Sequence, residues 1–451
     1  MSRGAPKAQH ARSGHPVPPP VAGRPASPQV GGGAARPRPA PRPLRLRRLT
    51  MFGPAFVAAI AYVDPGNYAT NFAAGSGYGG SLLWVLIGSN VIAALVQMLS
   101  AKLGLATGRN LAELCRDRFS RSAAAMLWFP AELVAIATDL AEVVGGAIAI
   151  HLLFGLPLLV GGVVTAALSF LLLGLEERGH RKFEAGIAVF LGLIVAAFLW
   201  GGSMADAFAV DVTPSLPGQQ ALLLTVGIVG ATVMPHVIYL HSDLTRRHIH
   251  PEAEPGTASP HRPADPRHSS RLLWQIRLDV LIALGVAGFV NAAMLMMAAR
   301  VFHGRSTQVE SLERAYTGLQ DSVGGKAALA FAVALLASGL AASSVGTYAG
   351  QIVMAGFLRR SLPIALRRLC TMAPAIALLA LNISPTDALV WSQIALSFGI
   401  PFALIPLVRF TGDRTLMGPF VNGKATMAGA TAAAAVIILL NVVLLVQAVA
   451  G

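Results

Sequence analysis

The fold is decided by the stretch Ala61-Tyr62-Val63-Asp64-Pro65-Gly66-Asn67, in the middle of an apolar segment near residues 51–75. Proline has no backbone N–H and glycine has no helical bias, so Asp-Pro-Gly-Asn predicts a break in a membrane helix. Unwound backbone within a membrane is tolerated only where it lines a cavity. Such a break frees carbonyls, such as that of Ala61, beside a carboxylate and an amide. The alternative interpretation is a proline kink with a helix-capping aspartate.

A second break is predicted in the apolar segment near residues 219–242, which contains Gly230-Ala231-Thr232-Val233-Met234-Pro235-His236. A methionine before a proline in an apolar helix is, on its own, more often a core-packing residue. Two broken spans at corresponding positions of two five-helix halves are, however, typical of a transporter's substrate site. Asp64 and Met234 are 170 residues apart, which suits a repeat of five spans.

The composition indicates a polytopic membrane protein. Hydrophobic residues make up 54% of the 451 residues and charged residues only 12%, whereas soluble proteins average about 25% charged residues. Apolar runs near the length of a membrane-crossing helix recur along the chain. We expect an all-α protein with eleven spans, near residues 51–75, 81–103, 125–150, 157–174, 185–202, 219–242, 274–299, 327–357, 369–382, 386–408 and 425–449.

The distribution of basic residues predicts the orientation of the chain. With these spans, 31 of the 35 Lys and Arg residues fall on one side, and the other four lie in the loop between spans 7 and 8. Positively charged loops stay in the cytoplasm. We therefore expect a multi-pass protein of the cell (inner) membrane with a cytoplasmic N-terminus and an extracytoplasmic C-terminus.

Two segments outside the spans have biased compositions. Residues 1–45 hold eleven of the 29 prolines and predict a disordered, basic cytoplasmic tail before a transporter domain at 46–451. No recognition motif accompanies the tail, so we expect no nucleic-acid partner. The loop between spans 6 and 7 is most simply a flexible linker, or else a weak metal-sensing tract. Its histidines are His248, His250, His261 and His268.

The residues at the two breaks indicate the class of ligand. A carboxylate and an amide oxygen suit many cations, including Ca²⁺ and Mg²⁺. A thioether adds little for those ions but favours softer transition metals. Asp64, Asn67, Met234 and backbone carbonyls together therefore suggest Mn²⁺, Fe²⁺ and related ions. His236 is favoured as a proton relay, whereas His241 could ligate, relay protons or pack.

Three acidic residues share one face of the third span. Glu132, Asp139 and Glu142 are spaced so that a helix brings them together. Clustered carboxylates in a membrane suit proton carriage, and the alternative is a structural ion-pair network. Arg367 and Arg368, at the start of the ninth span, are candidate partners in either case.

Four stretches resemble the Nramp family of divalent-metal transporters. They are Asp-Pro-Gly-Asn at 64–67, Met-Pro-His at 234–236, the third-span stretch 131–142, and Thr-Tyr-Ala-Gly-Gln-Ile-Val-Met at 347–354. The resemblance covers residues 45–450 or so. It implies a LeuT-like fold of two inverted five-helix repeats, about 51–202 and 219–408, plus an eleventh helix at about 425–449.

The resemblance also implies proton-linked uptake of Mn²⁺ or Fe²⁺ as substrate, with no cofactor and no obligate protein partner. The implied metal ligands are Asp64, Asn67, Met234 and the Ala231 carbonyl, with the Ala61 carbonyl and Gln393 joining in some states. The implied proton and salt-bridge network contains Asp139, Glu142, Glu132, His236, Arg367 and Arg368.

Other functional classes fit less well. The chain has no Walker-type phosphate loop and no His-Glu-x-x-His helix, so neither an ATP-driven pump nor an intramembrane metalloenzyme is expected. Its two cysteines, Cys115 and Cys370, lack metal-ligand spacing. A passive cation channel would need a repeated charged ring. The main alternative is a sodium-coupled organic-solute carrier of the same fold, against which Met234 argues because a thioether offers little to Na⁺.

Overall fold

The computed structural model describes residues 54–177, 189, 192–196, 210–249, 266–304, 311–359 and 362–450, and within these ranges every regular element is helical. The first half contains α1 (Pro54–Ala61), α2 (Pro65–Tyr78), α3 (Leu83–Thr107), α4 (Leu111–Arg118), α5 (Arg121–Phe154) and α6 (Leu158–Glu177). The second half contains α9 (Gly218–Val233), α10 (Pro235–Ile249), α11 (Pro266–Phe302), α12 (Leu312–Ser322), α13 (Gly325–Leu358), α14 (Ile364–Ala380), α15 (Pro385–Thr411), α16 (Arg414–Met417), the 3₁₀ turn η1 (Gly418–Phe420) and α17 (Lys424–Ala450).

Helices coincide with all predicted spans except the fifth, at 185–202, most of which lies outside the described residues. The first and sixth spans are each divided in two, as predicted. Seven described helical segments are long and apolar enough to cross a membrane. They are Leu83–Thr107, Arg121–Phe154, Gly218–Ile249, Arg271–Phe302, Gly325–Leu358, Pro385–Thr411 and Lys424–Val449. The total of eleven spans stays a prediction.

Two other sequence predictions fall wholly or partly outside the described residues. The tail at 1–45 is one of them, and the division of the chain at residue 46 stays a prediction. Most of the loop between spans 6 and 7 is another, including His250 and His261, as is the side chain of His268.

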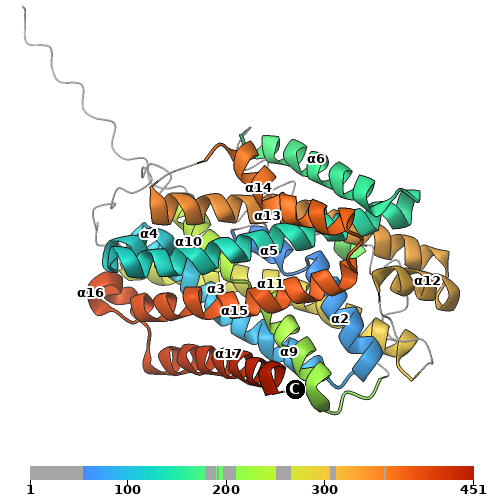
Figure 1. The fold of residues 1–451 in the computed structure, drawn as a ribbon. Coiled ribbons are helices and arrows are strands. Elements are labelled where there is room, and N and C mark those ends of the chain that lie inside the picture. Colours follow the sequence, from blue (N-terminus) through green and yellow to red (C-terminus); the bar gives the residue numbers. More distant parts are fainter. Residues whose placement is uncertain are drawn as a thin grey trace, which may run out of the picture. The chain divides into compact units, whose positions relative to one another are not determined.

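The broken sixth span lies at the centre of the helical bundle. In its most apolar window, 94% of the residues of Gly218–Ile249 are buried, against 28% for Lys424–Val449 in α17. Figure 1 shows α17 along one edge of the bundle and α6 along the opposite edge. The packing agrees, because α6 contacts α5, α13 and α14, whereas α17 contacts α3, α9 and α15. Both breaks are therefore enclosed by protein.

Small residues bring α5 and α13 close together. A Cβ at Gly339 would lie 3.2 Å from the backbone oxygen of Glu142, and one at Gly346 would lie 2.7 Å from its carboxylate oxygen. Close helix contact through glycine is common in membranes, where association depends on van der Waals packing. The glycines of α13 thus leave the room that the acidic face of α5 occupies.

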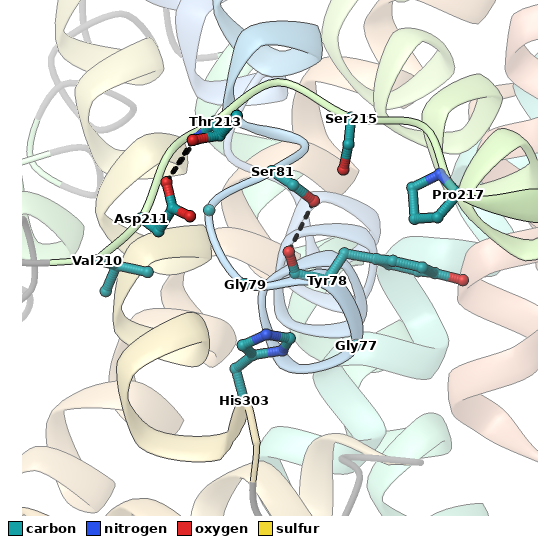
Figure 2. A pocket seen from close by; sticks show the side chains of 11 residues that line it. Gly77, Tyr78, Gly79, Ser81, Val210, Asp211, Thr213, Ser215, Pro217 and His303 are labelled. Carbon is teal, nitrogen blue, oxygen red and sulfur yellow. Dashed lines mark hydrogen bonds between the residues drawn. The ribbon is translucent and has the colours of Figure 1, made fainter.

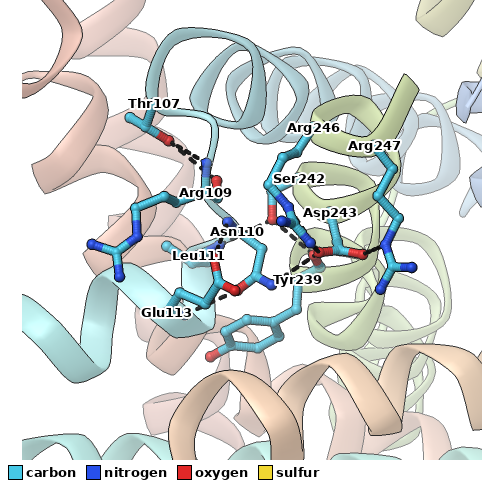
Figure 3. A network of polar contacts seen from close by, with 10 residues as sticks. All are labelled: Thr107, Arg109, Asn110, Leu111, Glu113, Tyr239, Ser242, Asp243, Arg246 and Arg247. Atoms are coloured by element: carbon cyan, nitrogen blue, oxygen red, sulfur yellow. Dashed lines mark hydrogen bonds and ion pairs between the residues drawn. The ribbon is translucent and has the colours of Figure 1, made fainter. Parts of the chain in front are cut away.

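A buried polar network fixes the far end of α10 (Figure 3). Asp243 accepts hydrogen bonds from Asn110 Nδ2 at 3.0 Å, from Arg246 at 2.6 Å and from Arg247 at 2.6 Å. Ser242 Oγ accepts a further bond, at 3.1 Å, from the backbone N–H of Leu111. Because Asn110 is also the N-cap of α4, the network ties α10 to the connection between α3 and α4.

We expect Asp243→Asn to destabilise the fold, since it leaves the buried guanidinium of Arg246 without its charged partner. Breaking a buried ion pair from one side costs about 3–5 kcal/mol. The thermal unfolding midpoint in detergent should fall by several degrees. The matched control is Asp117→Asn. Asp117 forms more exposed ion pairs with Arg109 and Arg116, and an exposed pair contributes about 0–1 kcal/mol. Equal midpoints for the two variants would contradict the role given to Asp243.

Candidate metal site

The first break has the geometry of a helix end followed at once by a helix start. α1 ends at Ala61, and Asp64, in extended conformation, is the N-cap of α2. Its Oδ1 accepts a hydrogen bond of 2.8 Å from the backbone N–H of Asn67. Pro65 suits the first position of α2 because that N–H would have no partner in the helix anyway. The local sequence therefore stops one helix and starts the next within three residues.

The second break is centred on one strained residue. α9 ends at Val233, α10 begins at Pro235, and Met234 between them has φ +29° and ψ 99°. A non-glycine residue with positive φ costs about 1–3 kcal/mol and persists only where its surroundings enforce it. Met234 is fully buried in the core of the bundle. Strain of this kind concentrates at functional sites.

The two prolines free equivalent carbonyls. In a continuous helix the carbonyls of Ala61 and Ala231 would each accept from the residue four positions on, which is Pro65 in one case and Pro235 in the other. The Ala231 carbonyl instead accepts a bond of 3.1 Å from Asn67 Nδ2. Within the described part of the chain, no donor reaches the Ala61 carbonyl.

The other carbonyls of the first break have partners. The carbonyl of Tyr62 accepts a bond of 2.6 Å from Asn291 Nδ2, and that of Val63 accepts one from Ser338 Oγ. Neither donor was predicted from the sequence. The signal that could have found them is a polar side chain in an apolar span, which in a membrane needs a partner. These bonds satisfy the carbonyls of Tyr62 and Val63, whereas the Ala61 carbonyl stays available to a ligand.

Asn67 joins the two breaks. Its Nδ2 donates to Asp64 Oδ1 at 2.7 Å and to the Ala231 carbonyl at 3.1 Å. All three residues are buried. A carboxylate and an amide of the first break and a freed carbonyl 164 residues after Asn67 therefore lie in one hydrogen-bonded cluster.

Gln393 brings α15 against this cluster. Its Nε2 lies 3.5 Å from Asp64 Oδ2, and its Oε1 is buried without a partner among the described residues. Glycines make the approach possible, since a Cβ at Gly66 would lie 1.8 Å from Gln393 Nε2 and one at Gly230 would lie 1.9 Å from its backbone oxygen. Both broken spans thus carry a glycine where α15 passes.

The ligand atoms at the two breaks suit a divalent transition metal as substrate. They differ from the histidine or cysteine clusters that hold resident metals. The described residues contain no group of three or more His, Cys, Asp or Glu placed to hold a metal. Hydrogen bonds connect Asp64, Asn67, Ala231 and Gln393, and Met234 follows Ala231 by three residues in the chain. Carboxylate, amide and carbonyl oxygens beside a thioether suit ions of intermediate softness.

The acidic face of α5 divides into paired and unpaired groups. Glu132 forms an ion pair of 2.9 Å with Arg367, at the beginning of α14. Asp139 Oδ1 and both carboxylate oxygens of Glu142 are buried and have no hydrogen-bond partner among the described residues. Arg368 is also fully buried and donates to Ser343 Oγ at 2.6 Å. Among the described residues, Glu132 is thus the one of the three predicted acids that forms a close ion pair.

The two predicted histidines have different neighbours. His236 Nδ1 lies 3.3 Å from Thr138 Oγ1, so it connects α10 to the acidic face of α5. His241 Nδ1 lies 2.8 Å from Gln97 Oε1, and Gln97 Nε2 donates to the Tyr62 hydroxyl at 2.6 Å. Sequence reasoning missed Thr138 and Gln97. Neither histidine contacts the cluster around Asp64 through a described hydrogen bond.

Known proteins resemble this chain over most of its length. A family model described as natural resistance-associated macrophage protein-like (Nramp) matches residues 55–447. "Divalent metal cation transporter MntH" of Mycobacterium tuberculosis is 49% identical over 407 residues, covering 89% of this chain and 92% of the relative. The protein of the same name from Bacillus subtilis is 45% identical over 404 residues, covering 88% and 92%.

Solved structures agree with these relatives. A crystal structure of the Eremococcus coleocola manganese transporter superposes with a TM-score of 0.74 at 31% identity, covering 87% of this chain and 85% of that one. The nucleobase-cation symporter Mhp1 superposes with a TM-score of 0.55 at 14% identity, covering 88% and 92%, which shows the fold alone. The LeuT-like fold is thereby confirmed, and so is the expectation of a transporter rather than an enzyme. On the family match and these identities, the chain belongs to the Nramp family.

Proposed function

We propose that this chain is a secondary active transporter that imports divalent transition metal ions, Mn²⁺ or Fe²⁺, together with protons. Transport would proceed by alternating access around the cluster between the two breaks. The observation that carries the proposal is the amide of Asn67, which joins Asp64 of one broken span to the Ala231 carbonyl of the other. The relatives' names support the same class of substrate. A sodium-coupled organic-solute carrier is not favoured.

The ligands we assign are Asp64, Asn67, Met234 and the Ala231 carbonyl. An arriving ion would replace the hydrogen bonds that Asn67 now makes to the other two oxygen ligands, so the cluster is already assembled for it. The Ala61 carbonyl and Gln393 Oε1 are further acceptors without partners in the described structure, and we assign them to some states of the transport cycle.

Helix polarity also favours a cation between the breaks. α1 ends at Ala61 and α9 ends at Val233, so both present C-terminal ends to the cluster. A helix C-terminus carries a partial negative charge equivalent to about half an elementary charge. Transporters with broken helices use such ends and unwound carbonyls to coordinate cations.

We assign the proton pathway to the acidic face of α5. Asp139 and Glu142 are the proposed carriers, because Asp139 Oδ1 and both carboxylate oxygens of Glu142 are buried without a hydrogen-bond partner among the described residues. His236 would pass protons between α10 and α5 through its contact with Thr138. The remaining members are Glu132, Arg367, Arg368 and His241, where the last would act through Gln97.

The orientation follows from the basic loops. We place the protein in the inner membrane with the N-terminus in the cytoplasm and the C-terminus outside. α1 then lies toward the cytoplasm and α2 leads outward, so the end of α2 at Tyr78 faces the side from which the metal arrives.

Asp64→Ala should abolish Mn²⁺ uptake, because the substitution removes the charged ligand of the cluster. The assay is uptake into proteoliposomes that hold a pH dye, with Asp321→Ala, an exposed acid at the end of α12, as control. We expect saturable Mn²⁺ entry with internal acidification in the wild type and the control only. Metal entry without acidification would contradict proton coupling, and a folded wild type without metal flux would contradict metal transport.

Met234→Ala should keep part of the Mn²⁺ uptake while weakening discrimination against Ca²⁺ and Mg²⁺. A loss of about tenfold in the ratio of inhibition constants, or about 1.4 kcal/mol, is expected. The control is Met296→Ala, which removes an equally buried thioether from α11. Competition assays measure the ratio, and unchanged selectivity in Met234→Ala would show that the thioether does not select the metal.

Pro235→Ala should lower Mn²⁺ affinity by roughly 10- to 100-fold, the range seen when the supports of metal ligands are removed. The alanine restores an N–H that can bond to the Ala231 carbonyl and occupy that ligand. Pro374→Ala, in the exposed part of α14, is the control for proline removal. The half-saturating Mn²⁺ concentration is the readout, and a value equal to that of the control would contradict the role of the freed carbonyl.

A further inference from the structure

A cavity of about 500 Å³ lies at the far end of α2, away from the cluster. Figure 2 shows it between the turn after α2, the segment that leads into α9, and the residue that follows α11. Its lining residues are Gly77, Tyr78, Gly79, Gly80, Ser81, Val210, Asp211, Thr213, Ser215, Pro217 and His303. Two of them, Asp211 and His303, are side chains that bind metals in proteins.

His303 is held with one nitrogen free. Its Nδ1 lies 3.3 Å from the Ser76 carbonyl, which can only accept a hydrogen bond, so Nδ1 carries the proton. Nε2 of the neutral ring then keeps its lone pair, and a hydrogen bond from the other nitrogen is the usual support of a metal-binding histidine. The ring lies against Gly79, where a Cβ would be 3.2 Å from Nε2.

Asp211 is held with one oxygen free. Its Oδ1 accepts two hydrogen bonds from Thr213, at 2.6 Å from Oγ1 and at 2.9 Å from the backbone N–H. Oδ2 takes no part in them. The backbone oxygen of Asp211 lies against Gly80, where a Cβ would be 2.5 Å away.

The surroundings of these two side chains favour a cation. The imidazole of His303 lies against Gly79 and the backbone oxygen of Asp211 lies against Gly80, and both residues line the same pocket (Figure 2). Two helices, α2 at Tyr78 and α11 at Phe302, end at this pocket, and their C-terminal ends carry partial negative charge. Arg300, one turn before His303, is not among the lining residues.

We propose that this pocket is an outer capture site, where His303 Nε2 and Asp211 Oδ2 bind a partly hydrated divalent transition metal before it moves to the cluster. The proposal rests on the proposed function for its direction of transport. Imidazole suits transition metals, whereas Ca²⁺ and Mg²⁺ prefer oxygen ligands alone. From Tyr78 back to Asn67 the distance along α2 is about 16 Å, at 1.5 Å per residue. An ion in this pocket and an ion at the cluster would therefore occupy two distinct sites.

The test is Mn²⁺ binding to the purified full-length Asp64→Ala protein, followed by the EPR signal of the free ion. This background removes the cluster as a binding site. We expect one weak Mn²⁺ site to remain, and His303→Ala or Asp211→Asn added to this background should weaken it at least tenfold. Even changes in the supports of metal ligands cost roughly 10- to 100-fold in affinity.

Two control variants match the proposed ligands. His151→Ala removes a half-buried histidine whose Nδ1 likewise contacts a carbonyl, that of Leu156, and Asp321→Asn removes an exposed carboxylate. Both should leave the weak site unchanged in the Asp64→Ala background. Absence of any Mn²⁺ binding there, or equal loss in controls and test variants, would overturn the capture site. Because binding is read without transport, these results are independent of whether the protein carries metal.

Uptake supplies a second readout. In the otherwise wild-type protein, His303→Ala and Asp211→Asn should raise the half-saturating Mn²⁺ concentration, and the double variant should show less than the sum of the two effects in free energy. Such non-additivity is expected of two groups that bind one ion. Full additivity of the two substitutions would overturn joint binding.

Discussion

The missing N–H of two prolines is the constraint on which the site depends. Because Pro65 and Pro235 cannot donate, the carbonyls four residues earlier, of Ala61 and Ala231, lose their helical partners. A buried carbonyl without a partner is costly, and it must find another donor or a ligand. Asn67 supplies the donor for Ala231, and no described donor reaches Ala61. One missing atom per break thus creates both the opening in the helix and the oxygen that lines it.

The rest of the bundle is arranged to let other groups reach these openings. Gly66 and Gly230 allow α15 to pass so closely that Gln393 lies beside Asp64. Asn291 and Ser338 satisfy the neighbouring carbonyls of the first break, which would otherwise be orphaned in a buried place. The carbonyls of Tyr62 and Val63 are therefore satisfied by side chains of other helices, whereas no donor among the described residues reaches the Ala61 carbonyl. The satisfied acceptors stabilise the break, and the available acceptors can bind a ligand.

The sequence predicted the breaks because proline and glycine act on the backbone locally, within a few residues. It also predicted that Asp64 and Met234 belong together, since repeated breaks imply a repeated architecture. It could not predict the donors Asn291 and Ser338 or the bond from Thr138 to His236, because these join residues far apart in the chain through packing angles. Nor could it separate Glu132 from the other acids of α5. Which acid faces Arg367 depends on where α14 crosses α5, and no local pattern records that crossing.

Buried charges in this bundle are of two physical kinds, and the difference supports the assignment of roles. Asp243 accepts hydrogen bonds from Asn110, Arg246 and Arg247, so its charge is fully compensated and its removal would leave other groups unpaired. Asp139 and Glu142 are equally buried, but oxygens of both lack described donors. A carboxylate without donors is costly in a place that water does not reach, and it becomes less so when it takes up a proton. A group held in that condition is suited to gain and lose protons during a cycle, whereas Asp243 is suited to hold helices together.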